Sequence, residues 1–442
     1  IKRLQSSGAL IFDYGGHGRP DQVSHENVLR LTDFKAFSNK NLPLWVTATC
    51  DIMPYDGVEP TIGETAVLNE NGGAMAFFGT ARTVFVPQNK AINRAFMKYV
   101  LTYDSNGKPI TIGEAQRLTK SYLITSSEDR SANKLQYQLL GDPAVALHLP
   151  TQKVVVDSIN GISVNDTQKK ATLQAGSIAT ICGHIEGNND FTGLVSATIR
   201  DSRELITCNM NASAAADSAF AFYDYTKYLF NGSDSIKNGK FNISFAVPMD
   251  INYSDKAGIM NFHAVSSDKQ MLAHGYCTNF IVGGTAAVDN DSIGPSIYCY
   301  LNSPSFVNGG NVNSTPYFVA QITDANGINS TGNGIGHDLQ LIIDGDMAKT
   351  YTLNDNFVYD FGTYTSGTTY YQLPELSAGK HTLKFRAWDI LNNSSTVSLD
   401  FNVVRGLTPK LFIVGITKSP AATSTTFIIS HDRVGTTIDV DI

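Results

Sequence analysis

Apolar residues follow two different spacings in the first 150 residues of the chain. Short apolar runs at 8–14, 42–49 and 73–78 end at turn residues, which is typical of strands buried on both faces of a parallel sheet. Elsewhere apolar residues recur with helical spacing, and two of these segments begin with a Thr-x-x-Glu capping box. The predicted helices cover 26–37, 61–71, 89–104 and 111–123, and a short helix ending at 141 and a strand at 144–149 complete the region. This alternation predicts an α/β sheet with helical crossovers over residues 1–150.

Beyond residue 150 the hydrophobic pattern changes to a period of two. Runs such as 177–182 and 240–247 alternate apolar and polar residues between clusters of Gly, Asn, Asp and Ser. Short alternating strands separated by such turns predict all-β, immunoglobulin-like sandwiches, which we place at 151–285 and 286–405. The sequence therefore predicts a multidomain protein with an α/β domain followed by β-domains.

A histidine and a cysteine each follow one of the predicted buried strands. His17 lies in a Gly-Gly-His-Gly run after the first strand, and Cys50 follows the second. Chemistry in open α/β sheets collects beyond the carboxyl ends of the strands, so we expect the imidazole and the thiol to share one crevice. A nearby histidine helps a thiol to become the thiolate nucleophile of a cysteine peptidase. The backbone amides of Gly18 and Cys50 are suited to form the oxyanion hole of such a site.

These residues also have ordinary structural explanations. A cysteine at a strand end often serves as a small buried hydrophobe, and a histidine after two glycines is often a plain loop residue. The loop after the third strand contains Gly79, Thr80 and Arg82 and is expected beside the thiol. It either shapes a substrate pocket there or merely connects a strand to a helix. The joint pattern of histidine and cysteine favours catalysis over the structural explanation.

Composition excludes several classes of function. The formal net charge of −7 offers no basic patch for nucleic acid, and no apolar run approaches the roughly 20 residues of a membrane helix. None of the five cysteines forms a Cys-x-x-Cys pair, so we expect no metal centre and no cofactor. If Cys50 is the working thiol, the other four allow three disulfide pairings or stay free. Acidic turns near Asp291, Asp324 and Asp389 could hold structural calcium, but they lack EF-hand spacing and are expected to be structural turns.

The site motifs resemble those of a known peptidase family. The Gly-Gly-His17-Gly run and the Ala-Thr-Cys50-Asp strand end, with their spacing, are similar to the gingipain-type cysteine peptidases, and the segment 139–144 resembles the segment that closes their catalytic domain. This resemblance implies that residues 1–150 are the C-terminal part of a caspase-like domain. It also implies that His17 is the general base and acid, that Cys50 is the nucleophile, and that the amides of Gly18 and Cys50 hold the oxyanion.

Segments of the β-rich region resemble a narrower group, the type IX secretion sortases of Bacteroidota. The segments 308–313, 334–338 and 381–389 carry this resemblance, and 420–440 resembles the start of the C-terminal β signal domain of that system, predicted over 406–442. The resemblance implies a secreted enzyme at the outer membrane surface of a Gram-negative bacterium. Such an enzyme cleaves the C-terminal signal of cargo proteins through a cysteine thioester and transfers the cargo to an amine of surface lipopolysaccharide. Its implied partners are signal-bearing proteins, lipopolysaccharide and other components of the secretion system.

Two alternatives remain open at the level of sequence. One is a secreted, gingipain-like endopeptidase that degrades external protein. The other is an inactive scaffold whose β-domains bind components of the secretion machinery.

Overall fold

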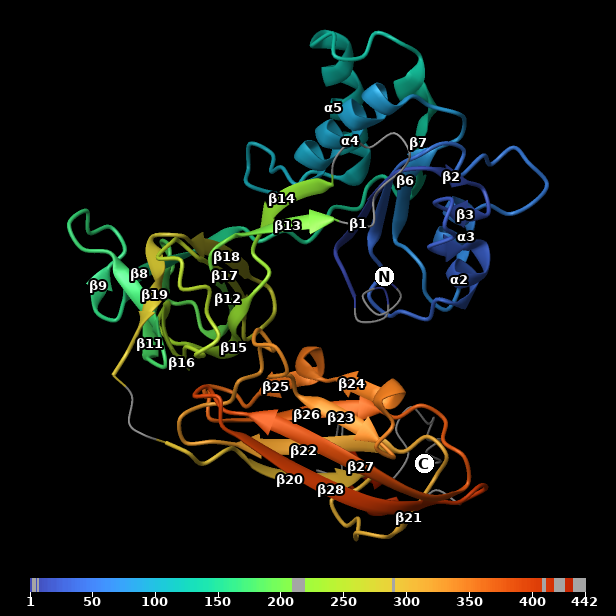
Figure 1. Ribbon diagram of the computed structural model, residues 1–442. Helices are drawn as coiled ribbons and strands as arrows, with labels where there is room; N and C mark the ends of the chain where they lie inside the picture. The colour runs from blue at the N-terminus through green and yellow to red at the C-terminus, as the bar shows by residue number, and fades with distance from the viewer. Residues whose placement is uncertain are drawn as a thin grey trace. The chain divides into compact units, whose positions relative to one another are not determined.

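The computed structural model describes residues 1, 5, 8–208, 219–287, 291–407, 411–416 and 426–431. The chain divides into two compact units, residues 1–151 and 152–442, and each is described by itself. Figure 1 labels their helices and strands.

A four-stranded sheet forms the centre of the first unit, with strand order β1-β5-β6-β7. The first three strands are parallel, and β7 runs antiparallel to β6. The strands are β1 (Ile11–Gly15), β5 (Leu44–Ala48), β6 (Ala76–Thr80) and β7 (Tyr137–Gly141). The three predicted parallel strands are therefore confirmed.

Helices cover both faces of this sheet. Neighbouring strand residues point to opposite faces, so Leu44 and Val46 pack into one hydrophobic core with α4 and α5, whereas Trp45 packs into another with α2 and α3. Figure 1 shows the two pairs of helices on opposite sides of the strands. The helices are α2 (Leu31–Ala36), α3 (Ile62–Leu68), α4 (Val86–Val100) and α5 (Ile112–Thr125). The result is the predicted α/β architecture with a doubly covered sheet.

Side-chain caps define the start of α3 and α5, as the capping boxes predict. The Thr61 amide donates to the Glu64 carboxylate at 3.0 Å, and the Glu64 amide donates back to the Thr61 hydroxyl at 3.4 Å. At α5 the Glu114 amide donates to the Thr111 hydroxyl at 3.2 Å, but the Glu114 carboxylate pairs with Arg117 instead. The second box is therefore only half formed.

Three predicted elements of this unit are wrong. The first half of the predicted helix 26–37 belongs instead to a small antiparallel sheet, in which Ser24 and Asn27 turn the chain with positive φ. Its strands are β2 (Gly18–Arg19), β3 (Gln22–Val23) and β4 (Leu29–Arg30). The predicted helix ending at 141 is a 3₁₀ turn, η1 (Asn133–Gln136), followed by β7, and 144–149 contributes only one isolated bridge, Thr111 to Ala146. Pairing with the open edge of β6 outweighs the local preference of this segment.

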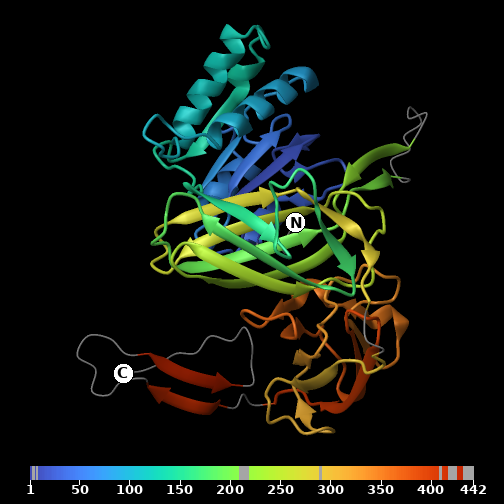
Figure 2. The same cartoon turned by 90° about the vertical axis from the view of Figure 1, so that its left-hand side faces the viewer.

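The first β-domain of the second unit forms one continuous, curled sheet instead of two separate sheets. Its strand order is β15-β12-β17-β18-β8-β11-β16, and β18 joins β8 through the parallel pairs Ala273–Gln152 and His274–Lys153. A separate parallel pair, β10 and β19, packs on the same hydrophobic core as this sheet. Figure 2 shows the strands of this domain, drawn in green and yellow, as two layers. The strands are β8 (Gln152–Ile159), β9 (Ile162–Ser163), β10 (Ala171–Ala175), β11 (Ile178–Ile185), β12 (Gly193–Arg200), β13 (Glu204–Cys208), β14 (Phe220–Asp224), β15 (Tyr228–Ile236), β16 (Lys240–Ala246), β17 (Ile259–Ser266), β18 (Leu272–Cys277) and β19 (Phe280–Thr285).

The second β-domain is a sandwich of two sheets around a shared core. The sheets have the orders β20-β22-β26-β25 and β21-β28-β27-β23-β24. Their elements are β20 (Ser296–Leu301), β21 (Asn311–Val312), β22 (Tyr317–Thr323), β23 (Gln340–Ile343), η2 (Met347–Lys349), β24 (Thr350–Thr352), η3 (Asn354–Asn356), β25 (Phe357–Tyr359), β26 (Ser366–Gln372), β27 (Gly379–Trp388) and β28 (Ser394–Val403). Beyond it, β29 (Leu411–Ile416) pairs antiparallel with β30 (Phe427–His431). The rest of the predicted signal domain at 406–442 lies largely outside the described residues.

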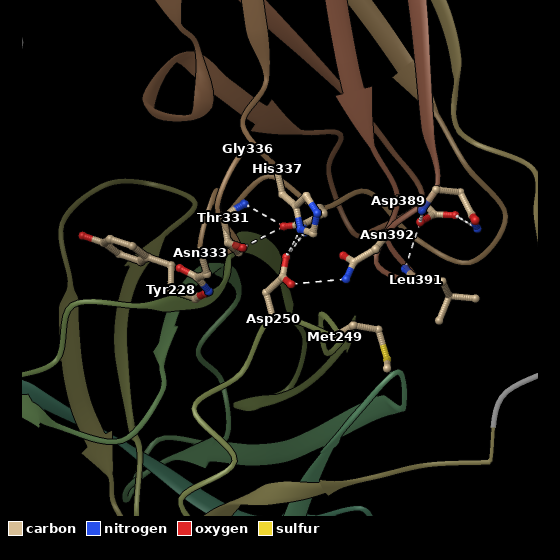
Figure 3. Close-up of polar contacts among 12 residues, drawn as sticks. Tyr228, Met249, Asp250, Thr331, Asn333, Gly336, His337, Asp389, Leu391 and Asn392 are labelled. Carbon is tan, nitrogen blue, oxygen red and sulfur yellow. Dashed lines mark hydrogen bonds and ion pairs between the residues drawn. The ribbon is translucent and has the colours of Figure 1, made fainter.

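A polar cluster around Asp250 joins the two β-domains of this unit (Figure 3). The Asp250 carboxylate accepts hydrogen bonds from the side-chain amides of Asn329 and Asn392, both at 3.2 Å. His337 Nδ1 lies 2.7 Å from the same carboxylate, and the centroid of its ring lies 4.3 Å from that of Trp388, with the two rings tilted by 42°. Because the Asp250 side chain is only 14% exposed, these contacts replace most of its hydration.

Candidate active site

Cys50 occupies a turn that is fixed by the loop following β6. The Cys50 thiol donates to the Val84 carbonyl at 3.4 Å. The next residue, Asp51, has φ of +46°, a left-handed conformation that costs a non-glycine residue free energy. The Asp51 amide donates to the Arg82 carbonyl at 3.4 Å, and the Thr83 hydroxyl donates to its carboxylate at 2.8 Å. These contacts hold the turn that presents Cys50 at the end of β5.

The His17 loop is tied to β1 and β5 through its backbone. The His17 carbonyl accepts hydrogen bonds from the Tyr14 hydroxyl at 2.8 Å and from the Ser24 amide at 2.9 Å. The Gly16 amide donates to the Ala48 carbonyl at 3.2 Å. A Cβ at Gly16 would lie 2.4 Å from the Tyr14 hydroxyl, so the glycine lets this hydroxyl reach the His17 carbonyl. The imidazole itself is exposed.

Gly18 packs directly against the strand end that carries the thiol. A Cβ at Gly18 would lie 2.4 Å from the Thr49 hydroxyl, so only glycine fits this approach without a shift. Gly18 pairs with Val23 in the β2–β3 ladder, and the Ser24 amide bonds to His17 in the adjoining pair. Hydrogen-bonded and non-hydrogen-bonded pairs alternate in an antiparallel ladder, so the Gly18 amide points away from β3. This direction is compatible with the predicted role as an oxyanion donor.

One cleft contains both candidate catalytic side chains. It has a volume of about 580 Å³ and lies at the carboxyl ends of β1 and β5, bounded by the N-terminal half of α4. Among the described residues no hydrogen bond links His17 to Cys50, and the two share the cleft without direct pairing. The lining residues are Asp13, Gly15, Gly16, His17, Ala48, Cys50, Val84, Val86, Asn89, Lys90, Asn93 and Arg94.

Comparison with known proteins finds a family match within this unit. Residues 1–148 match the model of peptidase family C25. We call residues 1–148 the C25 segment after this match. No curated protein sequence matches the chain.

Three solved structures are similar to the chain. The dimeric latent PorU from Porphyromonas gingivalis is 32% identical, with a TM-score of 0.40, and the match covers 83% of this chain and 34% of that chain. The Arg-specific cysteine proteinase gingipain R is 13% identical, with a TM-score of 0.29, over 63% of this chain and 54% of that chain. The complex of Porphyromonas gingivalis RgpB pro- and mature domains is 14% identical, with a TM-score of 0.31, over 64% of this chain and 56% of that chain. The chain thus spans about a third of the PorU chain and about half of the gingipain chains.

The predicted substrate-pocket residues of the C25 segment do not line the cleft. Gly79 and Thr80 are buried in β6, and the Thr80 hydroxyl donates to the Thr49 carbonyl at 2.5 Å. Thr80 therefore supports the strand end beneath the thiol and cannot contact substrate. Arg82 is exposed and forms a salt bridge with Asp56, whose pKa is lowered chiefly by the hydrogen bond from Arg82. Strand β6 extends through Thr80, further than the apolar run indicates, and therefore buries two of the three predicted residues.

Two residues near His17 in the C25 segment were not predicted from the sequence. The His25 ring lies 5.1 Å from the His17 ring. The pKa of Glu26 is lowered, chiefly by hydrogen bonds from its own backbone amide and from Ser24, and further by the charges of His25 and His17. Glu26 is thus an acidic group near His17 that does not line the cleft. Its segment carried a helical pattern, and no sequence signal placed it beside the imidazole.

Tyr137 is a third unpredicted residue of the C25 segment, next to the thiol. Its side chain is 1% exposed, and its hydroxyl has no hydrogen-bond partner among the described residues. Burial, and secondarily the proximity of Cys50, raise the pKa of this hydroxyl above its ordinary value. Tyr137 opens β7 opposite Thr80, in a segment that the sequence pattern assigned to a helix.

The described residues show neither a metal cluster nor a disulfide. No group of three or more His, Cys, Asp or Glu side chains there could hold a metal ion, and the thiols of Cys50, Cys182, Cys277 and Cys299 are not in disulfides. The acidic turns considered for calcium cap backbone amides instead: Asp324 accepts from Asn326 and Gly327, and Asp389 accepts from Leu391 and Asn393. Within the described part of the chain, every helix is too short or too polar to cross a membrane.

Proposed function

We propose that the chain carries the nucleophile and the general base of a cell-surface cysteine peptidase of the type IX secretion system, with sortase activity. The observation that carries this proposal is the cleft in a C25 segment, at the ends of neighbouring parallel strands, lined by both Cys50 and His17. The substrates are proteins with a C-terminal secretion signal, and the acceptor is an amine of surface lipopolysaccharide.

In the first half-reaction the Cys50 thiolate attacks the carbonyl of the peptide bond before the signal. The amides of Gly18 and Cys50 donate to the oxyanion of the tetrahedral intermediate. The His17 imidazolium then gives its proton to the departing amine of the signal, and a thioester between Cys50 and the cargo remains.

In the second half-reaction an amine attacks the thioester. Neutral His17 takes the proton of the attacking amine, the new amide bond forms, and the Cys50 thiolate is released. Water would give simple hydrolysis by the same route. The apolar side chains of Ala48 and Val84 in the cleft lining support transfer to the amine, since a drier site disfavours water.

The remaining parts of the chain fit a surface enzyme. We assign the second β-domain, with its two packed sheets, to an immunoglobulin-like spacer, and the β29–β30 hairpin to the start of the C-terminal β signal domain. The enzyme would be secreted to the outer membrane surface of a Gram-negative bacterium and would work with other components of the secretion system. The relation to PorU supports this choice within the C25 peptidases.

Mass spectrometry of a model reaction tests the proposal. The full-length protein is incubated with a cargo protein that carries a C-terminal secretion signal and with a small primary amine. Loss of the signal with the amine joined to the new carboxyl end is expected for the parent and for a Cys182→Ala control, but not for Cys50→Ala. Hydrolysis of unrelated proteins without amine transfer would instead indicate a degradative endopeptidase. Absence of cleavage by the folded protein would indicate a scaffold.

A further inference from the structure

The wall of the cleft formed by α4 carries two cations that form no salt bridge with any described residue. Lys90 and Arg94 both line the cleft and are exposed, and neither contacts a carboxylate among the described residues. Helix α4 contains no acidic residue. Cations four residues apart on a helix repel each other and destabilise it slightly, so this pair gives the fold no evident benefit.

The acidic group of the cleft does not neutralise these cations. The Asp13 carboxylate, on β1, accepts a hydrogen bond from the Asn93 side-chain amide at 2.7 Å. This contact engages Asp13 without cancelling either positive charge on α4. The cleft that holds the thiol therefore has more cationic than anionic side chains on its walls.

From this arrangement we infer that Lys90 and Arg94 form an anion-binding subsite, which selects peptide substrates with acidic side chains beside the cleaved bond. The spacing of the two cations supports an extended peptide as the occupant. Four residues of α-helix rise about 6 Å, and alternate residues of an extended strand lie about 6.6 Å apart on the same side. The pair thus matches two alternate side chains of a peptide lying along α4. This inference rests on the proposed function for the identity of the substrate, but not for the charge preference of the cleft.

Charged alkylating reagents measure that preference directly, without any catalytic turnover. Iodoacetate and iodoacetamide attack the same thiolate and lose the same iodide, so the ratio of their rates cancels the fraction of ionised thiol. We expect this ratio at Cys50 to exceed the ratio at Cys182, an internal control, by about three- to tenfold at low ionic strength. Site-resolved mass spectrometry of the intact 442-residue chain gives both ratios in one sample.

Substitutions on α4 assign the effect to the two cations. In the Lys90→Gln/Arg94→Gln variant the ratio at Cys50 should fall to that at Cys182, and about 0.5 M salt should have a similar effect on the parent. Lys98→Gln is the matched control, since Lys98 lies on the same helix but packs near Tyr99 and Tyr122, away from the cleft lining. Equal ratios at the two cysteines of the parent, or an unchanged ratio in the double variant, would overturn the subsite.

Peptide cleavage by the full-length protein then tests the occupant. Peptides with Glu near the cleaved bond should have a lower KM than matched Gln or Lys peptides, and the double variant should lose this difference with little change in kcat. If the double variant instead alters only the use of phosphoethanolamine relative to ethanolamine as acceptor, the assignment to peptide side chains is wrong. A labelling preference without cleavage of any peptide would refute the proposed function but support the anion subsite.

Discussion

The contact between Gly18 and Thr49 gives the most direct test of how the site is assembled. In Gly18→Ala the new methyl carbon would lie 2.4 Å from Thr49 Oγ1, 3.1 Å from Thr49 Cγ2 and 3.3 Å from Ile52 Cδ1. Gly18 does not have a positive φ, so the backbone accepts alanine and the cost comes from crowding alone. Overpacking of this kind destabilises a fold by about 1–3 kcal/mol. The crowding also pushes the His17 loop away from the strand end that carries Cys50.

A second substitution should relieve the first. Thr49→Ala removes both atoms nearest to the new methyl group. The Thr49 hydroxyl is fully buried without a hydrogen-bond partner among the described residues, so its loss breaks no bond, and the lost methyl group costs about 0.8 kcal/mol. The double variant should therefore be more stable than the sum of the single effects by about 1–2 kcal/mol. Additive effects, within about 0.3 kcal/mol, would refute the reasoning.

Urea unfolding followed by tryptophan fluorescence measures these free energies. Trp45 lies in the core between the sheet and α2, and a Trp388→Phe background removes the signal of the second unit. Gly15→Ala is the matched control, because a Cβ at Gly15 would meet no atom within 4 Å, and its stability should stay within about 0.5 kcal/mol of the parent. The iodoacetamide rate at Cys50 should fall in Gly18→Ala and recover in the double variant. A stability effect without this change in rate would show that the contact does not position the site.

Three further predictions concern other contacts. Thr80→Val should destabilise the first unit by about 1–2 kcal/mol in urea unfolding, because it removes the 2.5 Å hydrogen bond beneath the thiol. Thr47→Val removes a hydrogen bond of 3.4 Å and should cost less than about 0.5 kcal/mol. Equal costs for the two variants would contradict this reasoning. Burial raises the pKa of Cys299 to about 11, so its alkylation at pH 8 should be some hundreds of times slower than that of an ordinary thiol. The rate should rise about tenfold per pH unit towards pH 11. A rate independent of pH would contradict the raised pKa. Asp250→Ala leaves the side-chain amides of Asn329 and Asn392 and the His337 ring without their acceptor. This should destabilise the second unit by about 2–3 kcal/mol, which calorimetry detects as a lower Tm. An unchanged Tm would mean that this cluster does not join the two β-domains.

The sequence predicts those parts of the first unit that depend on local signals. Apolar runs and capping residues correctly place β1, β5, β6, α3 and α5, because a long buried strand or a capped helix carries its signal within a few residues. The two-residue strands β2 to β4 carry no such signal, since their hydrogen bonds are set by the tight turns at Ser24 and Asn27. The segment 137–141 pairs with β6, which lies about 60 residues earlier in the sequence. The hydrophobic periodicity within a segment does not reveal such a distant partner. In the first β-domain the parallel pairs between β18 and β8 likewise join segments far apart in sequence.

The same distinction applies to the site. The strand-end rule correctly brings His17 and Cys50 to one cleft, because parallel neighbouring strands must end at the same edge. The residues that it misses, such as Glu26, Tyr137 and Lys90, reach the site from a turn, an antiparallel strand and a helix, to which the rule does not apply.

The backbone around Cys50 shows why the loop after β6 belongs to the site although two of its predicted pocket residues are buried. The left-handed Asp51 conformation costs of order 1 kcal/mol or more, and it persists only where surrounding contacts hold it. Those contacts come from 82–84: a carbonyl that accepts the Asp51 amide, a hydroxyl that binds its carboxylate, and a carbonyl that accepts the thiol proton. Only the thiol, and not the thiolate, can make the last contact, because a carbonyl has no proton to donate. Release of Cys50 from the Val84 carbonyl must therefore accompany ionisation, and a substrate that draws the thiol into the cleft would activate the nucleophile as it binds.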